Sequence, residues 1–428
     1  MLRKQLPSDV RKIRLLSKKQ HRWRRSCINL IASENIVSPA VREVLTSDFQ
    51  HRYAEGKPYK RYYQGTRYID EIETMATDLV KRLFKAQHAN VQPISGCLAN
   101  LAIYYAFTKV GDTLMVLPIP EGGHISHMAF GGAGVRGLKV TYLPFDAVEM
   151  NIDLDATAKK IRAIKPNLII LGGSIILFPP PVKEIRVLAD GCGAYLAYDA
   201  AHVLGLIAGG QFQDPLREGV HVISSSTHKT FPGPQGGIIL CGKEFAKRVD
   251  QAILPGLQSN HHLHHVAGLA IALLEMLQFG KEYASQIIKN AKALAESLNN
   301  YGFKVLGEHK GFTESHQVLI DVKAQGGGDP VARLLEQANI ICNKNLLPGD
   351  SLRNTKNPTG VRLGTAELTR LGLKESEMQQ VATFFKQIAL DGKNPKQVTE
   401  EVKAFMRNFS TVHYSFTKGE AYRYMEFY

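Results

Sequence analysis

The sequence of 428 residues lacks several features that define whole classes of protein. It contains no run of 18 uninterrupted apolar residues, so we expect no membrane-spanning segment. No apolar stretch follows the basic N-terminal residues, so we expect no secretory signal peptide. No repeat or low-complexity tract is visible, and hydrophobic (44%) and charged (21%) residues occur in ordinary globular proportions, which excludes a fibrous or wholly disordered chain.

Cysteine is scarce as well. The five cysteines are dispersed, and no two of them form a C-x-x-C pair. An odd, scattered set in a long chain indicates reduced thiols and a cytoplasmic location, and none has the spacing of a structural zinc site. We therefore expect no disulfide framework. The five are Cys27, Cys97, Cys192, Cys241 and Cys342.

Positive charge is concentrated at the N-terminus. The chain has 53 Lys plus Arg against 39 Asp plus Glu, a net charge of +14, and residues 1–25 hold ten basic side chains but one acid, Asp9. This arm has three interpretations: a nucleic-acid patch, a transit peptide or an amphipathic helix. Helical spacing of its apolar residues favours a helix packed on the body, and we do not expect nucleic acid as a partner. These residues are Val10, Ile13, Leu16, Trp23 and Cys27.

Between about residues 70 and 240 the sequence alternates helical patterns with short apolar runs. Such alternation with continuously apolar strands predicts a mostly parallel sheet covered on both faces, an α/β fold. The predicted helices are 75–84, 98–108, 155–164 and 182–190, and the predicted strands are 113–117, 139–143, 168–172, 195–199, 222–225 and 237–241.

The pattern changes from about residue 269. Two long helices are predicted at 267–277 and 283–299, then a strand at 318–322, a helix at 330–337, a strand at 361–363 and two further helices. This pattern predicts a smaller α+β domain. We predict a helical arm (1–45), a large domain (46–268) and a C-terminal small domain (269–428), with the junction near 255–265.

A lysine and an aspartate follow two of the predicted strands. Lys229 lies among hydroxyls and a histidine before a Gly/Pro turn, a setting that suits a Schiff-base lysine of lowered pKa; an ordinary loop lysine is the alternative. Asp199 ends another strand, where parallel sheets bind ligands, and a carboxylate there would keep a pyridine nitrogen protonated; a helix cap is the alternative. Ser95-Gly96-Cys97 begins a predicted helix and has the composition of a phosphate site.

Eight motifs follow one another along the chain: LIASEN (30–35), YAEG (53–56), KRYYQG (60–65), GGH (122–124), DAAH (199–202), THKT (227–230), NKN (343–345) and GVRLGT (360–365). In these motifs and in their order, the chain resembles the serine hydroxymethyltransferase family. The resemblance covers roughly residues 10 to 380 and implies a large domain of fold type I, the aspartate-aminotransferase-like fold of pyridoxal-phosphate enzymes. It also implies a homodimer whose active sites use residues of both subunits.

For the cofactor, the resemblance implies pyridoxal 5'-phosphate bound covalently to Lys229. Asp199 would pair with the pyridine nitrogen, and His124 would stack on the ring. Cys97 stands where the family usually has a second serine. The other implied contacts are Ser95, Gly96, His202, Ser226, Ser174 (offset by one position from the family's serine) and Tyr53 of the neighbouring subunit.

For the substrates, the resemblance implies that a one-carbon unit moves from L-serine to a tetrahydropterin, leaving glycine, in one-carbon metabolism and amino-acid biosynthesis. The carrier is tetrahydrofolate or tetrahydromethanopterin, and the segment 259–265 resembles the methanopterin-using branch. Ser33, Arg362 and His202 would bind the amino-acid carboxylate. Glu55 of the neighbour would be the acid/base, with Tyr63, Thr227 and His228 as further catalytic residues. Ile119, Gly123, Ile125 and Asn345 match pterin-contacting positions.

The segment after Pro255-Gly256-Leu257-Gln258 departs from the family, since Ser259-Asn260 replaces a Gly-Gly pair that contacts the partner's phosphate. His261 and His265 would share one face of a helix, which suggests a metal site, but no cysteine or carboxylate accompanies them. We expect a cofactor-side dimer segment and no metal.

Two other functions stay open. A pyridoxal-phosphate aldolase acting on threonine or an α-methyl amino acid would need Lys229 and Asp199 but no pterin site. A non-catalytic RNA-binding role of the basic arm would predict salt-sensitive binding.

Overall fold

Short apolar segments build a seven-stranded sheet in the first part of the chain; the sequence predicts six of its strands but not the edge strand at 88–90. The computed structural model describes residues 7–426, so Arg3 and Lys4 of the basic arm lie outside the described residues. The strand order is β4-β12-β11-β10-β9-β5-β6, and within this sheet β12 runs opposite to the other six strands. The strands are β4 (His88–Asn90), β5 (Thr113–Val116), β6 (Lys139–Tyr142), β9 (Leu168–Gly172), β10 (Tyr195–Asp199), β11 (Val222–Ser226) and β12 (Gly237–Cys241).

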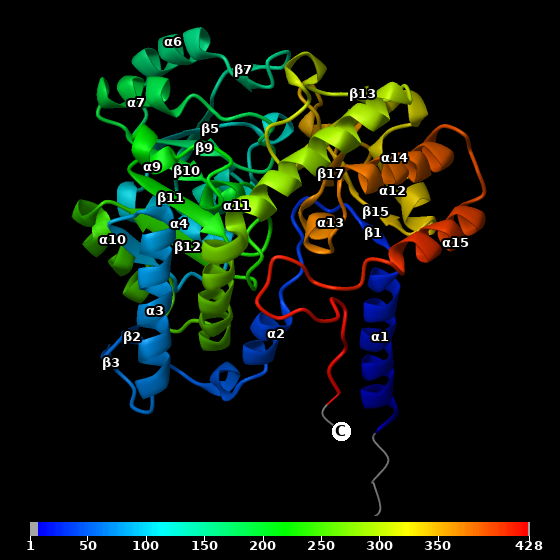
Figure 1. Ribbon diagram of the computed structural model, residues 1–428. Helices are drawn as coiled ribbons and strands as arrows, with labels where there is room; N and C mark the ends of the chain where they lie inside the picture. The colour runs from blue at the N-terminus through cyan, green and yellow to red at the C-terminus, as the bar shows by residue number, and fades with distance from the viewer. Residues whose placement is uncertain (1–6, 427–428) are drawn as a thin grey trace, which may run out of the picture.

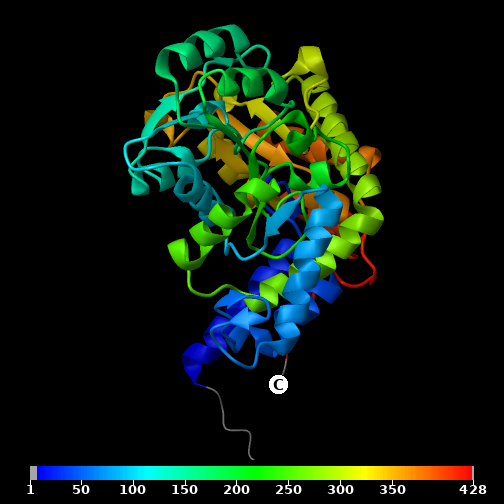
Figure 2. The same ribbon diagram turned by 90° about the vertical axis from the view of Figure 1, so that its left-hand side faces the viewer.

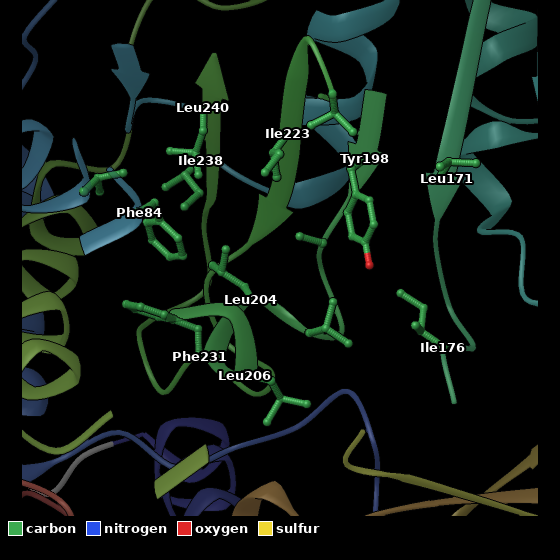
Figure 3. Close-up of a cluster of buried hydrophobic side chains, with 14 of the residues drawn as sticks. Phe84, Leu171, Ile176, Tyr198, Leu204, Leu206, Ile223, Phe231, Ile238 and Leu240 are labelled. Carbon is green, nitrogen blue, oxygen red and sulfur yellow. The ribbon is translucent and has the colours of Figure 1, made fainter. Parts of the chain in front are cut away.

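Both faces of this sheet are buried, because alternate strand residues enter two different hydrophobic clusters. Tyr198 and Leu240 belong to the cluster shown in Figure 3, whereas Ala197 and Ile239 face the other side. The first face is covered by α3 (Arg67–Phe84), α6 (Leu154–Ile164), α7 (Val182–Asp190), α8 (Leu204–Ala208) and part of α11 (Leu263–Asn300), and the second by α4 (Gly96–Phe107) and α10 (Ala246–Gln251).

The C-terminal part contains a four-stranded antiparallel sheet with its own core, which fits the predicted α+β pattern. Strand β1 (Ile28–Asn29), just after the arm, pairs in parallel with β15 (Ile340–Ile341), so the N-terminal segment packs on this part. The sheet order is β13 (Lys304–Val305), β14 (Gln317–Asp321), β17 (Gly360–Gly364), β16 (Asn343–Asn345), and its helices are α12 (Gly328–Gln337), α13 (Ala366–Arg370), α14 (Glu375–Ala389) and α15 (Pro395–Met406).

Helix α11 runs unbroken from Leu263 to Asn300, so the prediction of two separate helices there was wrong. Gly280, within α11, lies where Gly209 at the end of α8 approaches: a Cβ on Gly209 would stand 2.4 Å from the Gly280 carbonyl oxygen. Of the helices in residues 7–426, α11 is the one long and apolar enough to match a membrane span. Most of that stretch is buried, which is typical of a core helix.

The same helix joins the two parts of the chain (Figure 1). Its residues up to Ile287 belong to the core under the seven-stranded sheet, and those from Ala291 belong to the core of the C-terminal part. The predicted junction at 268/269 therefore lies inside a continuous helix. The division into arm, large domain and small domain stays a prediction.

The basic arm forms α1 (Ser8–Arg25), which projects from the body in Figures 1 and 2. The expected packing holds only at its C-terminal end, where Trp23 Nε1 donates to Asn339 Oδ1 (3.0 Å) and Cys27 is fully buried. For Val10, Ile13 and Leu16 it was wrong within this chain, since 38%, 65% and 54% of these residues remain exposed. Within residues 7–426, nothing covers this apolar face of α1.

The remaining α-helices and strands of the described residues are short and connect those above. They are α2 (Pro39–Leu45), β2 (Gly56–Lys57), β3 (Lys60–Arg61), α5 (Gly132–Val135), β7 (Phe145–Asp146), β8 (Asn151–Ile152) and α9 (Pro215–Glu218).

A buried ion pair links α11 to α13 and yields a stability prediction. Arg370 donates to Glu275 Oε2 at 2.6 Å, and both side chains are inaccessible to solvent. Arg370→Leu leaves the buried carboxylate of Glu275 without a compensating charge, so we expect the free energy of unfolding in urea to fall by about 3–5 kcal/mol. The double variant Arg370→Leu/Glu275→Leu should lose clearly less unfolding free energy than the single variant. Equal losses in the two variants would show that the buried charge is not the cause.

Candidate active site

Lys229 lies in the turn that follows β11, at the edge where the parallel strands end. Its Nζ donates to Ser226 Oγ at 2.6 Å, and its carbonyl accepts from Asn35 Nδ2 (2.5 Å). Burial lowers the pKa of Lys229 to about 8, with Asp199 opposing this shift and Arg362 adding to it. Thr227 is buried and fixes the turn, because Thr227 Oγ1 donates to the Pro234 carbonyl (2.7 Å). The lysine is thus held in place and lowered in basicity.

Asp199 ends β10 and is 3% exposed. It accepts from Asn100 Nδ2 (2.8 Å), from His127 Nε2 (3.2 Å) and from the Ala201 backbone N–H (3.0 Å). Burial opposes ionisation, but the hydrogen bonds from His127 and Asn100 hold the pKa of Asp199 well below its ordinary range. A fixed anion therefore lies inside the site.

The phosphate site predicted at Ser95, Gly96 and Cys97 is the N-terminus of α4. Ser95 caps the helix by accepting from the Leu98 N–H (3.1 Å), and no acidic residue occupies the first turn. A Cβ on Gly96 would stand 3.0 Å from Ser226 Cβ, so the helix begins against the end of β11. Free backbone N–H groups at a helix start attract anions, and the Cys97 side chain is exposed there.

Imidazoles surround this centre and are kept neutral. Burial lowers the pKa of His124 to about 4 and that of His228 to about 4, the latter with help from Lys229. Burial, Arg362 and Lys229 lower the pKa of His202 well below its ordinary value. His124 Nδ1 accepts from the Ser126 N–H (3.2 Å). These rings can pack and hydrogen-bond, but they do not carry charge near neutral pH.

Arg362 on β17 reaches the same edge of the sheet. Its guanidinium donates to the Ser174 carbonyl (2.7 Å), and burial lowers its pKa to about 10. The Ser174 hydroxyl has no hydrogen bond within residues 7–426; its carbonyl makes the contacts. Ser33 lies near His228 on the wall of a cavity of about 820 Å³.

The four residues predicted to contact a pterin line one cavity of about 380 Å³. His124, Ser174 and Arg362 line it too, so it opens onto the centre described above. The four are Ile119, Gly123, Ile125 and Asn345.

Tyr53, Glu55 and Tyr63 are not brought to this centre. They lie around the β2–β3 hairpin below the seven-stranded sheet (Figure 1), and no contact joins them to Lys229 in the described chain. The Tyr53 and Tyr63 rings pack at 4.8 Å, and Tyr53 Oη lies 2.6 Å from Ser259 Oγ. Asn260 Oδ1 accepts from the Ala54 N–H (3.0 Å), so the residues expected to serve a neighbour form one surface.

The histidines at 261–265 do not share a helical face, because α11 begins only at Leu263. His261 Nε2 donates to buried Glu73 (2.8 Å), whereas His265 Nδ1 donates to the Gln235 carbonyl (2.5 Å). Within residues 7–426 no group of three His, Cys, Asp or Glu side chains has the arrangement of a metal site.

Sequence reasoning missed the partners of Asp199. Asn100 lies inside α4 and His127 in the turn after His124, and nothing in their local sequence marks them as neighbours of a carboxylate. Their one signal is polarity on elements that are otherwise buried and apolar. Ser224 Oγ donates to Asn100 Oδ1 (2.5 Å), which ties this pair to β11.

These residues fit pyridoxal phosphate. A buried amine of lowered pKa suits an aldehyde, a charged buried carboxylate suits a protonated pyridine nitrogen, and a helix start suits a phosphate. Lys229 follows β11, Asp199 ends β10, and the phosphate site is the start of α4. All three lie at the same edge of the sheet.

Known proteins resemble this chain over nearly its whole length. The family model for serine hydroxymethyltransferase matches residues 6–385. The serine hydroxymethyltransferase of Methanocaldococcus jannaschii is 59% identical, covering 98% of this chain and 99% of its own, and that of Methanothermobacter marburgensis is 57% identical, covering 97% of each.

A solved structure, the L-threonine transaldolase of Pseudomonas fluorescens in its internal aldimine state, is 30% identical. It superposes with a TM-score of 0.87, covering 95% of this chain and 93% of its own, and confirms the predicted fold class. The chain therefore belongs to the serine hydroxymethyltransferase family.

Proposed function

We propose that this protein uses pyridoxal phosphate to transfer the hydroxymethyl group of L-serine reversibly to a tetrahydropterin, giving glycine. The observation that carries the proposal is the buried pair of Lys229 and Asp199 beside the N-terminus of α4. Family membership supports the same reaction, because the curated relatives at 53–59% identity are named serine hydroxymethyltransferase.

The cofactor's protonated ring supplies an electron sink for the bonds at the substrate Cα. Lys229 binds it covalently, Asp199 keeps the ring nitrogen protonated, and His124 covers the ring face. Ser95, Gly96 and Cys97 bind the phosphate, with Ser226 beside them. Because His127 and Asn100 already hold Asp199 as an anion, no proton needs to leave it when the cofactor binds.

The amino-acid carboxylate binds to Arg362, with Ser33 and His202 beside it. A guanidinium fork matches a carboxylate, and charge-assisted bonds of this kind are about twice as strong as neutral ones. Arg362 is held by the Ser174 carbonyl in the described chain, so its position is set before substrate arrives. Thr227 and His228 keep Lys229 in its turn.

A second copy of the chain completes the site. Tyr53, Glu55 and Tyr63 are distant from Lys229 in one chain, and Tyr53 and Tyr63 remain 41% and 43% exposed. The apolar face of α1 is uncovered as well. A homodimer would cover these surfaces and supply Tyr53 to the phosphate, with Glu55 as acid/base at the serine hydroxyl. The segment 259–265 packs beside Tyr53 and belongs to the same interface.

The pterin binds in the cavity lined by Ile119, Gly123, Ile125 and Asn345. Tetrahydrofolate and tetrahydromethanopterin both meet this description. We further propose that the protein acts in the cytoplasm, which its dispersed, unpaired cysteines support.

The aldolase alternative is not favoured. The threonine transaldolase shares the fold at 30% identity, whereas relatives at 53–59% identity over nearly the whole chain carry the hydroxymethyltransferase name.

The lowered basicity of Lys229 yields a pH prediction. The neutral amine attacks the cofactor aldehyde, so the rate of covalent attachment to the apoprotein should rise with pH and level off above a midpoint of about 8. For an ordinary lysine the midpoint of this pH dependence would lie at about 10.4. Stopped-flow absorbance after mixing with pyridoxal phosphate measures the rate. Lys229→Ala should abolish the visible band and exposed Lys323→Ala should retain it; a band that survives Lys229→Ala would refute the assignment.

Site sharing predicts complementation between two inactive variants. Glu55→Gln should keep cofactor and glycine binding but lose serine-dependent transfer. Lys229→Ala should lose this binding as well as the transfer. After joint unfolding and refolding, half the dimers are mixed and each mixed dimer holds one intact site. Activity should therefore return to about a quarter of the wild-type value. No recovery, with mixed dimers present, would mean that Glu55 acts within its own chain.

The overall reaction is tested by serine turnover with tetrahydrofolate and tetrahydromethanopterin in parallel. We expect stoichiometric glycine and methylene carrier with at least one of them. Asn345→Ala should raise the KM for the carrier by about tenfold, the value of one or two hydrogen bonds, and leave glycine affinity unchanged. Serine cleavage that ignores both carriers would favour the aldolase instead.

A further inference from the structure

A buried glutamine with no role so far lies behind His202. Gln317 is the first residue of β14 and is inaccessible to solvent. Its Oε1 accepts from the Ile176 N–H (2.8 Å), and its Nε2 donates to the Ser174 carbonyl (2.8 Å). An N–H can only donate and a carbonyl can only accept, so these two backbone groups fix which end of the carboxamide carries nitrogen.

The same Nε2 lies 3.0 Å from His202 Nδ1. Because an amide nitrogen offers only hydrogens, His202 Nδ1 must be the acceptor and carries no proton. Burial, Arg362 and Lys229 lower the pKa of His202 well below its ordinary value, so the ring is neutral. Its single ring proton is therefore on Nε2.

A second residue supports this tautomer independently. His316 Nε2 must carry a proton, because it donates to the Ala32 carbonyl (3.0 Å). The same nitrogen lies 3.4 Å from His202 Nδ1, and the two rings stack at 5.5 Å with an interplanar angle of 18°. Both neighbours of Nδ1 are thus donors. Within residues 7–426, His202 Nε2 has no hydrogen-bond partner.

We propose that Gln317 is a positioning residue that fixes His202 as the Nε2–H tautomer, ready to donate to an anionic oxygen of the bound ligands. This rests on the proposed function for the ligand's identity, since both the substrate carboxylate and the cofactor's phenolic oxygen qualify. In this tautomer His202 Nε2 donates a hydrogen bond and does not accept a proton. Gln317 also donates to the Ser174 carbonyl, which accepts from Arg362 as well. One carboxamide therefore orients both His202 and Arg362.

The tautomer is measured by nitrogen NMR of full-length apoprotein labelled with ¹⁵N-histidine, with a His202→Asn spectrum for assignment. In the wild type, His202 Nδ1 should give the shift of an unprotonated nitrogen. In Gln317→Glu, a carboxylate oxygen replaces the donor, and Nδ1 should become protonated. A protonated Nδ1 in the wild type, or an unchanged Nδ1 in Gln317→Glu, would overturn the proposal.

The consequence is measured by equilibrium titration of Gln317→Met with pyridoxal phosphate and then with glycine. Loss of one oriented donor to a charged oxygen should weaken binding about tenfold. Weaker glycine binding alone identifies the carboxylate as the acceptor, and weaker cofactor binding identifies the phenolic oxygen. Unchanged affinity for both ligands would refute the positioning role.

A matched control is Gln286→Met, which removes a carboxamide bonded to Asn290 (2.9 Å) and Glu375 (2.8 Å), away from these ligands. It should leave both affinities at wild-type values; an equal loss there would refute a specific role of Gln317. If wild-type protein bound neither ligand, the proposed function would fail, whereas the apoprotein tautomer would still be decided by NMR.

Discussion

The structure depends above all on keeping Asp199 charged inside the protein. Removing a carboxylate from water is costly unless hydrogen bonds and opposite charge replace the solvent. Asn100, His127 and the Ala201 N–H supply that replacement. Asn100 also accepts from Ser224, and this bond ties α4 to β11. The contacts that stabilise the anion therefore also set the start of α4 beside the end of the strand that precedes Lys229.

On the substrate side, the segment that follows β1 packs tightly on β17 of the C-terminal part. The Gly364 N–H donates to the Leu30 carbonyl (2.8 Å), and a Cβ on Gly364 would lie 2.4 Å from Ala32 Cα. Ser33 and Arg362 flank this contact in sequence, one from each chain segment. Because α11 and the Arg370–Glu275 pair hold the C-terminal part against the rest of the chain, a shift between the two parts would move Ser33 and Arg362 together, relative to Lys229.

Sequence alone predicted the strands well, because each is a short apolar run bounded by turn residues. The runs at 168–172, 195–199 and 237–241 coincide with β9, β10 and β12. Lys229, Asp199 and the start of α4 were identifiable since they lie at strand or helix ends. The gap predicted between 277 and 283 shows where local patterns fall short: the helix continues through Gly280, which packs against Gly209 at the end of α8. The sequence did not identify Asn100, His127 or Gln317 for the same reason, since each acts through a residue that is far away in sequence.

Burial, reinforced by the positive charge of Lys229 and Arg362, keeps several histidines of this centre neutral. Lys229 and Arg362 place positive charge in the centre, against one buried anion, Asp199. A further cation would add repulsion to the cost of desolvation, and burial lowers the pKa of His124 and His228 to about 4 each and that of His316 to about 3. Neutral rings can each donate from one nitrogen and accept at the other. The positive charge then stays available for a phosphate and a carboxylate. The neighbours of each histidine fix its tautomer, and the tautomer decides which ring nitrogen donates a hydrogen bond.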